Sequence, residues 1–65
     1  MISATFQLFK TSGGDVAIFD GVFGKIKAGD IVTDGETTVR IKSMILPSLA
    51  LIKSQKESAV VEIVS

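Results

Sequence analysis

The chain contains no cysteine and no histidine, and it has no tryptophan or tyrosine. Disulfides and thiolate or imidazole metal sites are therefore excluded, and so is a histidine base for a nucleophilic serine. Sixty-five residues suffice for one domain, 1–65, and a chain of this size buries a thin core. Because no covalent or metal crosslink is available, extra stability must come from good packing or from self-association.

Charge of one sign and long apolar runs are also missing. Seven basic residues balance seven acidic ones, so no overall field attracts nucleic acid or anionic lipid. The start, "MISATFQLFK", lacks the features of a signal peptide. The longest apolar stretch, "MILPSLALI", is interrupted by Pro47 and is too short to span a bilayer. We expect a soluble, cytoplasmic protein that does not bind membranes.

What the sequence does contain is a hydrophobic pattern with a period of two. Apolar residues alternate with polar ones from Ile2 to Leu8, and the pattern predicts a strand. Further strands are predicted at 15–19, 31–32, 37–44 and 58–65, separated by Gly/Asp turns, of which Asp34-Gly35 is the strongest hairpin signal. The sequence predicts an all-β fold, a small antiparallel, Greek-key-like β-barrel of five to six short strands.

One segment, 47–56, fits two structures. Pro47 followed by Ser48, Leu49, Leu51 and Ile52 can begin another strand, or one or two helical turns. Periodicity alone does not separate these alternatives in a short apolar run, and we favour the strand.

Four aspartates stand beside glycines, at Asp15, Asp20, Asp30 and Asp34. Such carboxylates could serve acid–base catalysis or calcium, but Asp-Gly pairs are more typical of turns. The spacing lacks the alternating ligands of a calcium loop, and no nucleophile motif is present. We therefore expect no enzyme activity, no metal, no cofactor and no small-molecule substrate.

Two pairs of basic residues alternate along the chain: Lys25 with Lys27, and Arg40 with Lys42. If the two segments are neighbours, these side chains could contact RNA phosphates. The alternative, which we favour, is that they form an ordinary solvated face, because no tyrosine or tryptophan is present to stack a base.

Phe9, Phe19 and Phe23 fall partly out of step with the apolar face. They fit two interpretations equally, a second layer of the core or an exposed patch that meets a partner. Since the core is small, the sequence favours self-association into a homo-oligomer, or binding of a protein partner.

The segment from Gly13 to Met44 resembles a known family. The pattern G-x-I-K-x-G-D-x-V, a glycine turn and V-x-I-K-S-M is similar to the second-domain β-barrel of translational GTPases such as elongation factor Tu. The matching residues are Gly24, Ile26, Lys27, Gly29, Asp30, Val32, Gly35, Val39, Ile41, Lys42, Ser43 and Met44. The turn before the last strand departs from the family, as does Asp20, where the family usually has a basic residue.

The family's barrel contacts its GTPase domain, ribosomal RNA or the tRNA acceptor end, and none of those contact residues maps onto this chain. Because no GTPase domain is present in the sequence, nucleotide hydrolysis is not implied. The resemblance implies a non-catalytic binding module of the translation-factor type, with an RNA- or ribosome-contacting module as the alternative.

Overall fold

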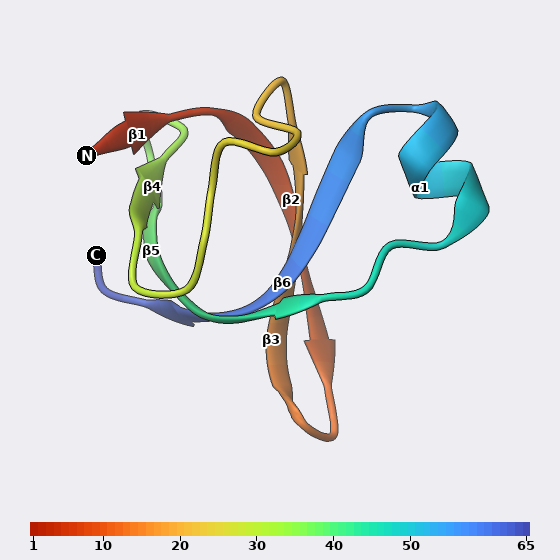
Figure 1. The fold of residues 1–65 in the computed structure, drawn as a ribbon. Coiled ribbons are helices and arrows are strands. Elements are labelled where there is room, and N and C mark those ends of the chain that lie inside the picture. Colours follow the sequence, from red (N-terminus) through yellow and green to blue (C-terminus); the bar gives the residue numbers. More distant parts are fainter.

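A computed structural model describes all residues, 1–65, and confirms that the fold is mostly β (Figure 1). One six-stranded sheet contains nearly all of the regular structure, and a single short helix joins its last two strands along the chain. The elements are β1 Ile2–Ser3, β2 Thr5–Thr11, β3 Gly14–Asp20, β4 Ile31–Thr33, β5 Thr38–Ile45, α1 Leu49–Lys53 and β6 Lys56–Ile63.

The strands lie in the order β1-β4-β5-β6-β3-β2. Neighbours are antiparallel, as predicted, with one exception: β1 and β4 are parallel, with Ile2 opposite Val32. Alternation of apolar and polar residues predicts a strand but not the direction of its neighbour, so the parallel pairing of β1 with β4 could not be predicted from the sequence. Only Ala4 separates β1 from β2, so one N-terminal segment supplies the strands at both ends of the order. Closure into a barrel stays a prediction.

The β4–β5 hairpin turns at Asp34-Gly35, as predicted. The Asp34 Oδ1 atom accepts hydrogen bonds from the backbone N–H groups of Glu36 (2.9 Å) and Thr37 (2.8 Å). Gly35 has a φ of 99°, a left-handed conformation that glycine adopts without a steric penalty. The turn thus depends on both residue types.

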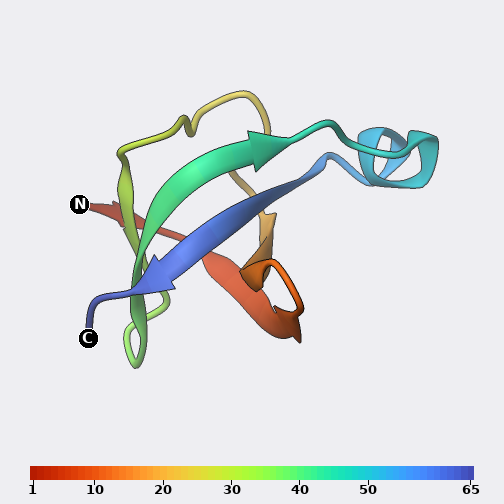
Figure 2. The ribbon, with the colours of Figure 1, turned by 90° about the horizontal axis from the view of Figure 1, so that it is seen from below.

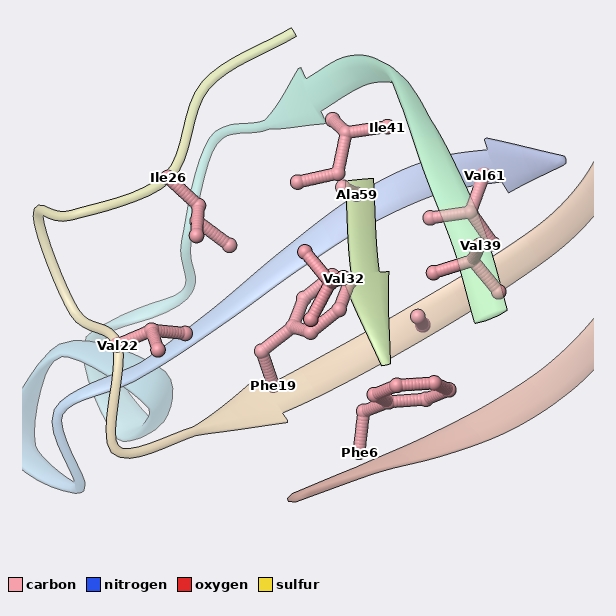
Figure 3. Close-up of a cluster of buried hydrophobic side chains, with 10 residues drawn as sticks. Phe6, Phe19, Val22, Ile26, Val32, Val39, Ile41, Ala59 and Val61 are labelled. Carbon is pink, nitrogen blue, oxygen red and sulfur yellow. The ribbon is translucent and has the colours of Figure 1, made fainter. Parts of the chain in front are cut away.

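The core contains ten buried apolar residues, which come from every strand except β1 and from the loop between β3 and β4 (Figure 3). Within it the rings of Phe6 and Phe19 pack at 5.3 Å between centroids, tilted by 57°. Ala17 and Ala59 lie opposite one another on β3 and β6 and are fully buried. The core residues are Phe6, Ala17, Phe19, Val22, Ile26, Val32, Val39, Ile41, Ala59 and Val61.

A register shift interrupts the pairing of β5 with β6. Ile41 lies opposite Val61 and Ser43 opposite Val60, so Lys42 is the extra residue of a β-bulge. Before the bulge, Val39 and Ile41 face the core, as predicted. After it the alternation is reversed, and Ile45 lies on the outer face with an exposed side chain.

The preferred prediction of a strand within 47–56 is wrong, because Leu49–Lys53 is the helix α1. Ser48 is its N-cap and accepts a hydrogen bond from the Leu51 N–H at 3.3 Å, which satisfies one of the free donors of the first turn. The helix buries none of its residues. No core-facing stripe therefore marked it as a helix in the sequence, and the N-cap Ser48 is the local feature that fits a helix start.

We predict that Phe19→Ala destabilises the protein far more than Phe23→Ala. Phe19 is fully buried, and truncating a buried Phe costs about 3–5 kcal/mol, whereas Phe23 is partly exposed. Urea unfolding of the two variants and the wild type measures the difference. Equal losses for the two variants would contradict the core described here.

Candidate functional site

The four predicted basic residues lie on two neighbouring segments of the chain. Arg40 and Lys42 are exposed on β5, whereas Lys25 and Lys27 are exposed on the loop between β3 and β4. Backbone hydrogen bonds join Gly29 and Asp30 of this loop to Ile41 of β5, but no side-chain contact links the two basic pairs. The residue between the loop lysines, Ile26, belongs to the core. Packing of Ile26 therefore explains why both neighbouring lysines point to solvent.

Two of these four cations are already paired with carboxylates. Arg40 lies opposite Glu62 on β6 and donates from Nε to Glu62 Oε1 at 3.0 Å, with a second contact from Nη2. This hydrogen bond, followed by the charge of Arg40, lowers the pKa of Glu62 below its ordinary value, and Lys42 contributes weakly in the same direction. Lys27 Nζ lies 3.8 Å from Asp30 Oδ1. The positive charge available to an RNA backbone is reduced accordingly.

Two of the four aspartates are turn residues, as the sequence predicts. Asp30 accepts a hydrogen bond from the Lys27 N–H at 2.9 Å, and Asp34 accepts the two described above. For the other two the turn interpretation is wrong, because both belong to strand β3, with Asp15 opposite Lys10 and Asp20 opposite Lys56. No three acidic side chains come together in an arrangement that could hold a metal ion.

The largest depression has a volume of about 420 Å³ and lies where β1 and β2 meet the β4–β5 turn. Its lining is small and polar, namely Ser3, Ala4, Thr5, Thr33, Asp34 and Gly35. The N–H groups of Thr37 and then Glu36 hold the pKa of the Asp34 carboxyl below its usual range. A general acid at neutral pH needs the opposite shift, so the geometry does not favour acid catalysis here.

The three phenylalanines proposed as a partner surface are separated by the fold. Phe19 is fully buried against Phe6, so its assignment to a partner interface is wrong and its assignment to the core is right. It lies on the inner face of β3, opposite Phe6 on β2, which the strand register decides. Phe9 remains 45% exposed on β2, and Phe23 is exposed in the loop after β3.

An apolar surface that was not predicted from the sequence surrounds α1; we call it the apolar arm and define it as Ile45–Ile52. Leu46 is 93% exposed, and Leu49 and Ile52 are also exposed. Figures 1 and 2 show α1 at the far side of the molecule from both termini, beyond the ends of β5 and β6. The signal was present, because no charged residue occurs between Lys42 and Lys53.

The chain matches no known family model, and comparisons with curated proteins and with solved structures find no match either. The resemblance to the translational GTPase barrel therefore stays a prediction. The single helix, Leu49–Lys53, is too short to cross a membrane.

We predict that Asp34→Asn reduces the dependence of stability on pH in acid. The hydrogen bonds that lower the pKa of Asp34 exist only in the folded state, so its carboxylate stabilises the fold above its ordinary pKa of 3.8. This contribution is lost as the pH falls through the lower folded-state pKa. Denaturant unfolding at a series of pH values should therefore show a shallower acid slope for Asp34→Asn than for the wild type.

The matched control is Glu36→Gln in the same turn, because the Glu36 side chain is exposed and makes no hydrogen bond. In this variant the free energy of unfolding should depend on pH in acid as it does in the wild type, because Asp34 is intact. An unchanged slope in Asp34→Asn would show that the turn hydrogen bonds do not persist in solution.

Proposed function

We propose that this chain is a non-catalytic interaction module that acts by associating with a second copy of itself. The observation that supports the proposal is the exposed apolar surface, which holds as many large side chains as the core holds residues, ten in each case. The exposed residues are Met1, Leu8, Phe9, Phe23, Ile45, Leu46, Leu49, Ile52, Ile63 and Val64. Several of them are close together in the chain, Leu8 with Phe9 and the four residues between Ile45 and Ile52, and clusters of exposed apolar side chains are typical of interaction sites.

Charge supports a second copy as the partner. The formal net charge is zero, so two copies meet without overall repulsion, and proteins near zero net charge tend to associate. Surface charges are also paired within the chain, as in Arg40 with Glu62 and Lys27 with Asp30. Contacts between copies are therefore expected to be apolar and main-chain contacts rather than ion pairs.

Three observations support the non-catalytic part of the proposal. The chain has no histidine, the largest depression is lined by small side chains, and its one carboxylate has a lowered pKa. Assignment to the translation-factor β-barrel type rests on the sequence resemblance alone. Contact with RNA or the ribosome, the alternative from the sequence, is less favoured, because Arg40 is paired with Glu62 and Lys27 Nζ lies 3.8 Å from Asp30.

We predict that the wild-type protein forms an oligomer whose population rises with protein concentration. Light scattering after size-exclusion chromatography should give a mass above the 6.9 kDa of one chain. Since the contacts are expected to be apolar, added salt should leave association unchanged or strengthen it.

The same preparation should be titrated into a structured RNA at low salt. RNA binding that weakens steeply with salt, from a protein that stays monomeric at every concentration, would contradict self-association and favour the alternative. A folded monomer that binds no RNA would contradict both functions.

A further inference from the structure

Strand β2 is a long, open edge of the sheet. It is the last strand in the order and pairs only with β3, whereas the strand at the other end, β1, has two residues (Figure 2). Natural proteins block such edges with prolines, bulges or central charges. The seven residues of β2 include no proline, and their only charge, Lys10, lies near the end of the strand. The edge is therefore open to another strand.

The hydrogen-bonding groups that face this edge follow from the backbone. Ala4 donates its N–H to Thr33 of β4 at 2.9 Å, on the side of the N-terminal segment away from β3. Alternate residues of a strand point their N–H and C=O groups the same way. The groups of Phe6, Leu8 and Lys10 thus point away from β3, and those of the residues between them point toward it.

The β2–β3 turn agrees with this assignment. Thr11 lies opposite Gly14, and only Ser12 and Gly13 separate them. In a two-residue hairpin the closing pair is hydrogen-bonded, which directs the backbone groups of Thr11 toward β3. Because these groups alternate in direction along the strand, the N–H and C=O groups of Lys10 and Leu8 point to the open edge. Counting from Ala4 gives the same result.

We infer that β2 pairs in an antiparallel manner with β2 of a second copy, around a two-fold axis at Leu8. This inference rests on the proposed function and names the surface that carries it. In this register Leu8 lies opposite Leu8 of the other copy, and Phe6 lies opposite Lys10. Every free main-chain group of Phe6, Leu8 and Lys10 then finds a partner, and the two sheets become one continuous sheet.

Other registers leave more main-chain groups of β2 unpaired or place like charges opposite one another. An axis at Phe6 or at Gln7 leaves part of the edge of β2 unpaired, because the N–H group of Ala4 is already bonded to Thr33 of β4. An axis at Lys10 places the two Lys10 ammonium groups directly opposite, which destabilises a strand pair. The axis at Leu8 instead keeps the only charge of β2 away from its equivalent. With zero net charge on the chain and no like charges opposite one another at the axis, a second copy meets this edge without repulsion, and we therefore assign a second copy as the occupant.

Side chains beside the axis also favour the pairing. Leu8 is 37% exposed and lies next to the buried Ala17 on β3, and Phe9 is exposed on the opposite face next to Val16. In the dimer Leu8 contacts its equivalent, and Phe9 lies opposite Gln7 of the other copy. Both faces of β2 thus lose exposed apolar surface at the axis.

Charge-swap variants at the axis test the inference. Leu8→Lys and Leu8→Glu each place like charges opposite one another, and each should weaken dimerisation by more than about tenfold. An equimolar mixture should form a heterodimer, because Lys then faces Glu. Sedimentation of each variant and of the mixture measures this, with circular dichroism to confirm folding. The matched controls, Ala28→Lys and Ala28→Glu on the exposed loop between β3 and β4, should dimerise like the wild type. Leu46→Lys and Leu46→Glu test the apolar arm as the competing surface.

Amide hydrogen exchange of the wild type gives a second readout that needs no variant. The N–H groups of Phe6, Leu8 and Lys10 should become protected as protein concentration rises, whereas those of Thr5, Gln7 and Phe9, bonded within the chain, should not change. Protection that is independent of concentration would overturn the inference.

The failures of the two proposals are distinguishable. If the wild type is a monomer at every concentration, the proposed function itself fails. If the wild type associates but the Leu46 variants, and not the Leu8 variants, weaken it, self-association stands and the β2 edge is wrong. If the mixture of Leu8 variants does not restore the dimer, the two-fold axis at Leu8 is wrong.

Discussion

The packing of the Phe19 ring against Phe6 is the contact on which the rest of the fold depends. Phe19 belongs to β3, which pairs with β2 on one side and with β6 on the other, and β6 pairs in turn with β5. The two rings thus hold the N-terminal segment, which lies at both ends of the strand order, against β3, and β3 connects it to β6 and β5. With no disulfide and a core of ten residues, few other contacts could replace this one.

A core of this size has consequences for the surface. A small domain lacks the volume to enclose all its apolar side chains, and this chain is rich in them. The polar surface is largely satisfied within the chain, by turn hydrogen bonds to Asp34 and by the pairing of Arg40 with Glu62. The groups that remain without a partner are the apolar side chains of the apolar arm and the main-chain N–H and C=O groups along the edge of β2. Function is therefore more naturally sought in association than in chemistry.

Strand positions could be predicted from the sequence because alternation and turn residues are local. Val39 and Ile41 face the core and Asp34-Gly35 turns the chain, as the pattern indicated. The bulge at Lys42 could not be predicted, because it depends on how β5 meets a strand far along the chain. The helix was missed because it buries no residue and leaves no periodic stripe. The sequence correctly predicted that the basic side chains are exposed. It did not predict that Arg40 pairs with Glu62 or that Lys27 lies near Asp30.

The sequence by itself determined an all-β domain without crosslinks, the turns at Asp-Gly pairs, and a balance of charge that makes association possible. These follow from composition and from residues close together in the chain. Tertiary structure decided that Phe19 is buried while Phe9 is exposed, and that Arg40 meets Glu62. It also decided which strand forms the open edge. The reason is physical: burial and pairing depend on cross-strand neighbours, and those neighbours are chosen by register over long distances in the chain.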